Sequence, residues 1–420
     1  MTPIPARKSG SARTGWVLGG TAILLMPIAL FAPKGVAVLF VIAATLVFVM
    51  TFDAGRIRSI LKQPISRLLA AFIVFAVISA TWSIAPASSL RSALTLGLAF
   101  FSGLYLIDTM GRLGKADRDL VFSGIIVGGV LGLSLIAFEH STNGLLTRLI
   151  LAAKGRDANP ATNFMPALNS GMSVLALYAW PWALVLKSRF GAAVMVLGLL
   201  VCGGLIFLSN ADTPVLALLA GFVIAVLSLP SKKGVLAIFA VIAGVGIAAA
   251  PLLPGALPDP HTEARAYSKL SHSGVHRLVI WRTAAEHIAK SPVLGIGMNG
   301  TRFLYNSSDR IIQKYATDDP AMTWGNYAEP IPLHTHNGIL QIWLELGGIG
   351  ALLFAAVLLM VLWRLRQGGH DAITTAARLG MLVSGIVIFS LSFGPWQGWW
   401  QSAIWLSIAM MSATKTPETP

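Results

Sequence analysis

Residues 337–363, NGILQIWLELGGIGALLFAAVLLMVLW, contain a single ionisable side chain, that of Glu345. Because a helix rises about 1.5 Å per residue, a run of this length crosses the roughly 30 Å hydrocarbon core of a bilayer. Similar apolar runs recur along the 420 residues, of which 55% are hydrophobic and 11% charged, with a mean hydropathy of +0.73. Soluble domains carry about 25% charged residues, so the composition excludes an ordinary water-soluble enzyme and predicts an all-α, polytopic membrane protein.

Twelve apolar runs are candidate membrane spans. They are Trp16–Phe31, Val36–Phe52, Leu68–Ile84, Ser92–Thr109, Leu120–Phe138, Pro166–Leu186, Ala192–Leu208, Thr213–Leu229, Val235–Leu253, Asn337–Trp363, Leu379–Phe393 and Trp396–Ser412. They divide the chain into three predicted parts, namely helices 1–9 in residues 1–253, one long outer loop in residues 254–335, and helices 10–12 in residues 336–420.

The distribution of Lys and Arg orients these spans. If the N-terminus lies in the cytoplasm, every short inner connection is basic, as the positive-inside rule requires. Both termini are then cytoplasmic and the long loop lies outside. The net charge of +14 therefore reflects topology, and we expect no nucleic-acid partner. Cys202 is the only cysteine, which excludes an intramolecular disulfide and a multi-cysteine metal site.

The long loop contains a predicted amphipathic helix at Ser273–Lys290, where apolar residues recur at helical spacing. Pro292 and the following glycines end the run. We expect this helix to lie on or near the membrane surface, with Arg277 and Trp281 on one face.

The loop enters the tenth span at His334-Thr335-His336-Asn337. A histidine at a helix N-terminus feels the positive end of the helix dipole, which favours the neutral imidazole and suits a general base. The alternative is an interfacial histidine that caps the helix. Farther along, Glu345 lies on a polar stripe with Asn337 and Gln341, as either a catalytic group or a hydrogen-bond partner.

Several cations lie in predicted outer segments, against the topological bias, which suggests an anionic ligand such as phosphate or pyrophosphate. They are Arg148, Lys154, Arg156, Arg265, Lys269, Arg277, Arg282 and Arg302. The alternative is a solvated loop, because acidic residues in the long loop nearly balance its cations. His272 and His276 have a spacing that a metal could use, but without thiols or a clustered carboxylate motif we predict no metal and no cofactor.

Two motifs resemble the signatures of the bacterial O-antigen ligases and their Wzy-type polymerase relatives. Residues 336–350 fit the pattern H-[N/S/Q]-x9-G-x-x-[G/T/Y], through His336-Asn337, Gly347 and Gly350. Upstream, Arg277-x3-Trp281 leads to the turn Pro292-x-x-Gly295-x-Gly297, which is similar to the family's first signature. The two motifs occur in the family's order and together span about residues 273–350, and the twelve-span plan with one long late outer loop agrees with the family.

This resemblance implies a metal-independent, inverting membrane glycosyltransferase with a GT-C-like fold in the bacterial inner membrane. Its donor would be a glycan on undecaprenyl pyrophosphate, and its acceptor a sugar hydroxyl of lipid A-core or another glycan at the periplasmic face, as in lipopolysaccharide biosynthesis. The resemblance makes His336 the base and Arg277 a pyrophosphate contact. We predict further pyrophosphate contacts at Arg156 and Arg282. Supporting roles are predicted for His334, Asn337, Trp281 and Glu345.

Two alternatives to this function remain open. A Wzy-like or exopolysaccharide polymerase uses the same donor, and the motifs do not separate it from a ligase. A twelve-span transporter is the non-enzyme alternative. Common two-halved transporters carry a long cytoplasmic loop between spans six and seven, whereas this chain has only a short connection there.

Overall fold

The structure is a computed structural model that describes residues 13–156, 158–159, 163–260, 262–305, 309, 311–316 and 323–414. Most of the described chain is helical. The helices are α1 (Arg13–Phe31), α2 (Gly35–Thr51), α3 (Ala54–Leu61), α4 (Pro64–Ile78), α5 (Pro86–Gly111), α6 (Lys115–Ser141), α7 (Leu145–Ala153), α8 (Met165–Phe190), α9 (Ala192–Leu208), α10 (Asp212–Ser228), α11 (Lys232–Ala249), α12 (His272–Lys290), α13 (Gly338–Gln367), α14 (Ala372–Leu391) and α15 (Gly398–Ala413).

Each of the twelve predicted spans coincides with one helix, although the boundaries differ by several residues. Within the described residues, seven helices are long and apolar enough to cross a membrane, and α2, α9 and α10 are apolar but shorter. The helices of the first group are α1, α4 with the turn that follows it, α5, α6, α11, α13 and α14. The polytopic membrane character is confirmed, and the count of twelve spans stays a prediction.

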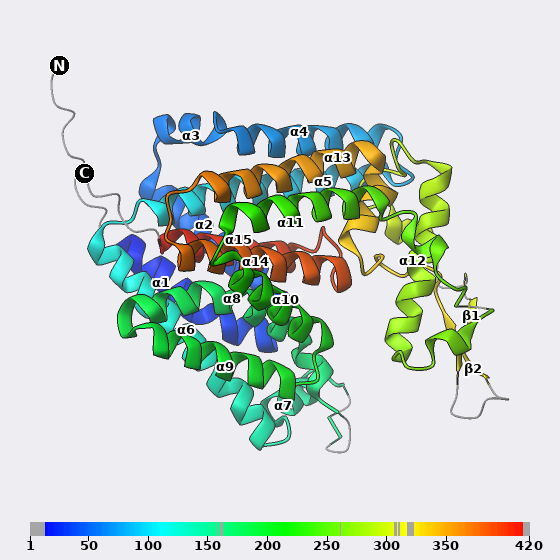
Figure 1. Ribbon diagram of the computed structural model, residues 1–420, viewed down its shortest axis with the longest axis horizontal. Helices are drawn as coiled ribbons and strands as arrows, with labels where there is room; N and C mark the ends of the chain where they lie inside the picture. Colours follow the sequence, from blue (N-terminus) through cyan, green and yellow to red (C-terminus); the bar gives the residue numbers. More distant parts are fainter. Residues whose placement is uncertain are drawn as a thin grey trace.

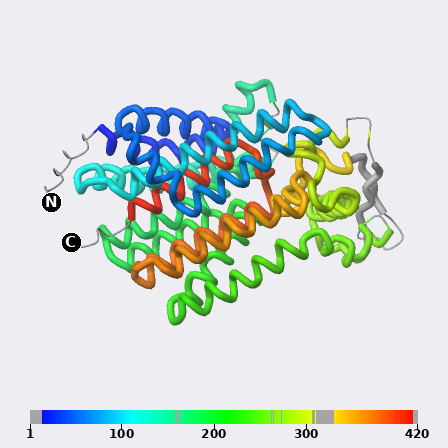
Figure 2. The backbone as a smooth tube through the Cα atoms, turned by 90° about the horizontal axis from the view of Figure 1, so that it is seen from above, coloured from blue at the N-terminus to red at the C-terminus, as the bar shows by residue number. Residues whose placement is uncertain are grey.

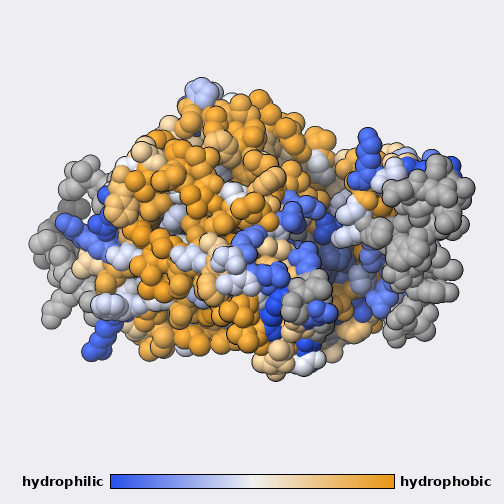
Figure 3. All heavy atoms as spheres, turned by 90° about the horizontal axis from the view of Figure 1, so that it is seen from below, coloured by the Kyte–Doolittle hydropathy of each residue, from blue (hydrophilic) through white to orange (hydrophobic). Residues whose placement is uncertain are grey.

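The helices pack as a bundle around α8. Residues Gly171–Leu186 of α8 are buried throughout, against α1, α6, α9, α10, α14 and α15. Beside this group, α4, α5, α11 and α13 lie along the long axis (Figure 1). Large apolar side chains cover the outside of the bundle, among them Val49 of α2 and Val241 of α11, which are 71% and 66% exposed. Figure 3 shows this hydrophobic expanse, with hydrophilic groups at its left edge and from the centre to the right of the view. Such a surface suits lipid contact.

The first residues of α1 and the last residues of α15 lie at one end of the bundle, and α12 lies at the other (Figures 1 and 2). This arrangement requires an even number of crossings between the two ends. It agrees with the predicted placement of both termini on one side and the long loop on the opposite side.

The amphipathic helix predicted in the long loop is confirmed as α12. The hydroxyl of Ser271 caps it by accepting a hydrogen bond from the Gly274 N–H at 3.2 Å. Its apolar residues Ile280 and Ala284 are fully buried and pack with Leu340 and Leu344 of α13. The apolar face of α12 is therefore covered by protein. The position of α12 on or near the membrane surface stays a prediction, because periodicity locates an apolar face without saying what covers it.

The loop also contains a short antiparallel hairpin of β1 (Ile311–Ala316) and β2 (Thr323–Ala328), paired from Ile311 opposite Ala328 to Ala316 opposite Thr323. The prediction of an all-α chain holds for the membrane part but misses this hairpin. Each strand is only six residues long, too short to stand out beside the helical runs.

Candidate active site

The segment His334–Asn337 forms the entry to α13. The Asn337 side chain is the N-cap, and its oxygen accepts hydrogen bonds from the backbone N–H groups of Ile339 and Leu340, both at 3.0 Å. The fully buried Thr335 donates its hydroxyl to the Asn337 carbonyl at 2.6 Å. The helix cap is therefore Asn337 and not a histidine, as the alternative supposed, which leaves both histidine rings free for other contacts.

His336 has a positive φ of 54°, a conformation that few non-glycine residues adopt. Its backbone N–H donates to Nδ1 of His334 at 3.1 Å, and the two rings lie 4.1 Å apart between centroids. Its own Nδ1 lies 3.0 Å from the carbonyl oxygen of Ser392. Because a carbonyl only accepts, this contact assigns the proton of a neutral ring to Nδ1 and leaves the lone pair on Nε2.

Burial and nearby positive charge both favour neutral rings. Burial, followed by the charges of Arg277 and His276, lowers the pKa of His336 to about 4, against an opposing effect of the Ser392 hydrogen bond. Burial, followed by the charges of His336, Arg302 and Arg277, lowers the pKa of His334 to about 3. Both rings are therefore neutral at pH 7, and Nε2 of His336 is able to accept a proton.

Arg277 and Trp281 lie one turn apart on α12. The Trp281 indole donates to the Thr335 carbonyl at 3.0 Å, which ties α12 to the histidine segment. Arg277 is half-buried, and its Nε is buried without a hydrogen-bond partner in the described part of the chain. Burial lowers the pKa of Arg277, and the opposing charge of Asp212 raises it. The structure thus brings His334, His336, Arg277, Trp281 and Asn337 together.

Two other predicted contacts lie apart from this group. Arg282 pairs with Asp259 at 3.7 Å and donates to the Leu257 carbonyl at 3.4 Å. Arg156 is exposed in the turn after α7. Neither charge contributes to the pKa shifts of His334 or His336, whereas that of Arg302 does. The sequence identified Arg302 only as one of several outer cations, and no motif in it selects this residue.

Glu345 is fully buried in α13 and accepts four hydrogen bonds. The donors are Asn299 N at 2.5 Å, Thr301 N at 3.3 Å, Gln341 Nε2 at 3.0 Å and Trp396 Nε1 at 2.5 Å. Of the two predicted alternatives, these contacts favour the hydrogen-bond partner, because both carboxylate oxygens are already occupied by protein donors.

The glycines of both motifs meet at a break in α13. Gly347 has a φ of 61° inside the helix, and the backbone groups released there bond to the turn between Pro292 and Gly297. Gly348 N donates to Pro292 O at 2.8 Å, and Gly297 N donates to Glu345 O at 2.9 Å. A Cβ on Gly347 would lie 2.2 Å from the Val293 carbonyl oxygen. The two motifs are therefore one packed unit, with glycine required where the backbones touch.

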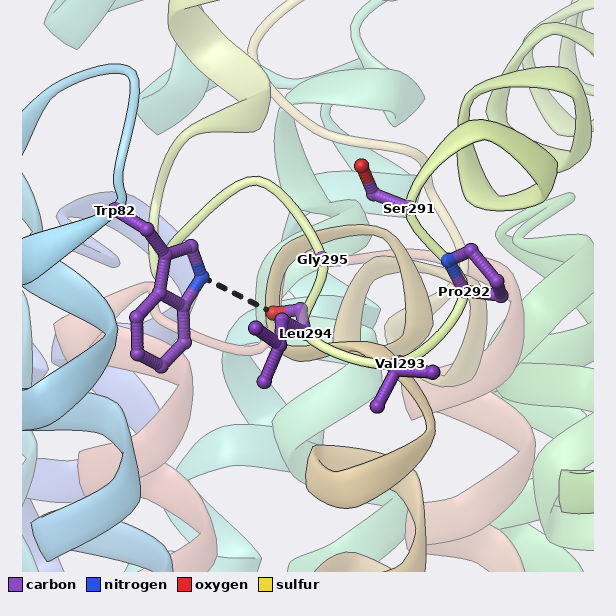
Figure 4. Close-up of a pocket in the computed structure, with 6 residues that line it drawn as sticks. All are labelled: Trp82, Ser291, Pro292, Val293, Leu294 and Gly295. Carbon is purple, nitrogen blue, oxygen red and sulfur yellow. Dashed lines mark hydrogen bonds between the residues drawn. The ribbon is translucent and has the colours of Figure 1, made fainter.

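A surface pocket of about 410 Å³ lies on the same turn, lined by Trp82 and residues 291–295 (Figure 4). The Trp82 indole donates to the Leu294 carbonyl at 3.3 Å, which holds the turn against the α4–α5 connection. None of the predicted site residues lines this pocket, so it is separate from the histidine pair.

Comparison with known proteins supports the resemblance carried by the motifs. Residues 195–355, which include both motifs, match the O-antigen ligase family model. The chain is also similar to three proteins named "Putative polysaccharide ligase". The one from Rickettsia felis is 26% identical over 86% of this chain and 85% of its own length. Those from Rickettsia typhi and Rickettsia bellii are 26% and 27% identical, each over 82% of this chain and 79% of its own length. No solved structure matches the chain significantly. The resemblance to the O-antigen ligase superfamily is confirmed.

Proposed function

We propose that this relative of the O-antigen ligases moves a glycan from undecaprenyl pyrophosphate to a sugar hydroxyl of lipid A-core, at the periplasmic face of the bacterial inner membrane. The observation that carries the proposal is the neutral His336 ring, with its Nε2 lone pair free, beside the unpaired Nε of Arg277. A general base and an anion-binding guanidinium are the two groups that this transfer needs.

In the proposed reaction, His336 Nε2 takes the proton of the acceptor hydroxyl as its oxygen attacks the anomeric carbon. The bond between that carbon and the pyrophosphate oxygen breaks, and undecaprenyl pyrophosphate leaves. Arg277 stabilises the negative charge that develops on the leaving group. Because displacement is direct, the configuration at the anomeric carbon inverts. The reaction needs no metal.

The same charges couple base strength to donor binding. The free site holds the pKa of His336 near 4 partly through Arg277. A bound pyrophosphate would neutralise that charge and raise the pKa of His336 toward its ordinary value of about 6.5. His336 would therefore become a stronger base once the donor is in place.

The proposal extends to the frame around the site. Residues 1–253 and 336–420 form the membrane parts of a GT-C-like fold, both termini are cytoplasmic, and residues 254–335 form the periplasmic loop. This is supported by the placement of α1 and α15 at the end of the bundle opposite α12 (Figure 1).

The test is transfer by the purified full chain in proteoliposomes. The donor is a glycan on undecaprenyl pyrophosphate, and the acceptors are lipid A-core and a second lipid-linked glycan, each with and without a chelator. Product on lipid A-core that persists with chelator is the expected result. Elongation of the lipid-linked glycan alone would indicate a polymerase. No product on either acceptor would refute the proposed function.

A further inference from the structure

We propose that Arg302 supplies the second guanidinium that binds the donor pyrophosphate, and that the buried Glu345 is the positioning residue that holds it there. This inference rests on the proposed function and adds a residue to the same site. It assigns to Arg302 the contact that the sequence assigned to Arg156 and Arg282.

The backbone directly before Arg302 is fixed to α13. Arg302 lies in a short 3-10 helix, Thr301–Phe303, directly after the turn that packs on the α13 break. Thr301 is buried, and its N–H donates to Oε1 of Glu345 at 3.3 Å. The Asn299 N–H donates to Oε2 of the same carboxylate at 2.5 Å, and its amide donates to Ser88 at 2.9 Å. The Arg302 side chain thus extends from an anchored backbone and is itself exposed.

The Glu345 carboxylate is also linked by contacts to the histidine pair, His334 and His336. Gln341 donates to Glu345 at 3.0 Å and lies one turn from Asn337. Gly394 lies between Gln341 and His334, because a Cβ there would be 3.1 Å from Cβ of His334 and 3.4 Å from Oε1 of Gln341. Arg302 also lies near enough to His334 for its charge to lower the pKa of that ring. The contacts of Glu345, Gln341 and Gly394 therefore link the segment that carries Arg302 to His334.

Availability separates Arg302 from Arg282. Across the described ranges, Arg302 has no hydrogen-bond or ion-pair partner, whereas Arg282 is held by Asp259. Arg277 lies on α12, and Arg302 lies on the segment whose backbone is bound to Glu345 of α13. A pyrophosphate carries two phosphate groups, and each matches the planar fork of one guanidinium.

Binding of undecaprenyl pyrophosphate to the full chain in nanodiscs tests the inference. We expect Arg302→Gln to weaken binding at least about tenfold, since it removes a charged hydrogen-bond donor. Arg302→Lys should recover part of the loss, because charge returns without the fork. Arg91→Gln removes an exposed charge in the second turn of α5 and is the matched control, expected to bind within about twofold of the unaltered chain.

Glu345→Gln tests the positioning role. We expect it to weaken binding, and the double variant with Arg302→Gln to bind no more weakly than Arg302→Gln alone, because both changes remove one contact. A purely structural role for Glu345 would instead give additive losses. Thermal melting of each variant separates lost binding from lost folding.

Three outcomes decide between the proposals. Unchanged binding by Arg302→Gln, or a larger loss for Arg156→Gln or Arg282→Gln, would overturn the assignment of Arg302 and leave the proposed function standing. Additive losses in the double variant would overturn the role of Glu345. If the unaltered chain binds no undecaprenyl pyrophosphate, the proposed function fails and this inference fails with it.

Discussion

The imidazole Nδ1 of His336 lies 3.0 Å from the backbone carbonyl oxygen of Ser392, 56 residues later in the chain. Ser392 is the C-cap of α14, so the end of α14 orients the His336 ring, which lies just before α13. A backbone acceptor cannot be removed by a side-chain substitution. The tautomer that leaves Nε2 free is therefore built into the packing of α14 against α13.

The first prediction concerns the base. His336→Ala should lower the rate of glycan transfer by about 10²- to 10⁴-fold, the usual contribution of a general base. The rate is measured with the reconstituted chain and the undecaprenyl pyrophosphate donor. His370→Ala, beyond the far end of α13, is the control and should keep its activity. Near-normal transfer by His336→Ala would exclude His336 as the base.

The second prediction is a pH profile. Because the neutral ring of His336 is the active form, kcat/KM should fall only as the pH drops toward about 4. Arg277→Gln removes a charge that lowers this pKa, so the acid limb of the residual activity should move to higher pH. Arg91→Gln should leave the limb in place. An acid limb that does not move in Arg277→Gln would contradict the electrostatic link between the two residues.

The third prediction concerns the guanidinium fork of Arg277. Arg277→Lys keeps the charge but loses the paired donors, so kcat/KM should fall at least about tenfold. Steady-state kinetics with varied donor measure the loss, and the melting temperature shows whether the fold is intact. Full activity in Arg277→Lys would show that a point charge is sufficient.

The fourth prediction concerns the break in α13. Gly347→Ala forces a Cβ to 2.2 Å from the Val293 carbonyl oxygen at a φ of 61°, and should lower the free energy of unfolding by about 2–4 kcal/mol. The matched control is Gly244→Ala in α11, where a Cβ meets nothing within 4 Å. Thermal unfolding in detergent compares the two. Equal melting temperatures for the two variants would show that the close approach of Gly347 to Val293 does not contribute to stability.

The sequence predicted the helices well because apolar length is a property of each segment alone. It located α12 to within one residue of its start, and it placed His336 and Arg277 in one site through the family resemblance. The surface that packs on the apolar face of α12, however, belongs to α13, which lies far away in the sequence. Periodicity contains no information on such a partner.

The choice among the remaining arginines could not be made from the sequence for a related reason. Arg156, Arg282 and Arg302 are equivalent as sequence, since each is a cation in a predicted outer segment. Only the fold shows that Asp259 forms an ion pair with Arg282 and that Glu345 accepts a hydrogen bond from the backbone beside Arg302. The hairpin and the break at Gly347 were missed because short strands and helix-packing glycines give weak local signals.

The backbone bonds between the turn at 292–297 and the broken helix bear on how chimeras with relatives must be designed. If only one signature were replaced by that of a relative, the turn at 292–297 and the break at Gly347 would come from different proteins. Any mismatch between their backbones would then leave N–H and C=O groups without hydrogen-bond partners at the edge of the bilayer. Residues 271–350 should therefore be exchanged as one cassette. Recombination points inside this interval are expected to yield poorly expressed hybrids, whereas points on either side should be tolerated.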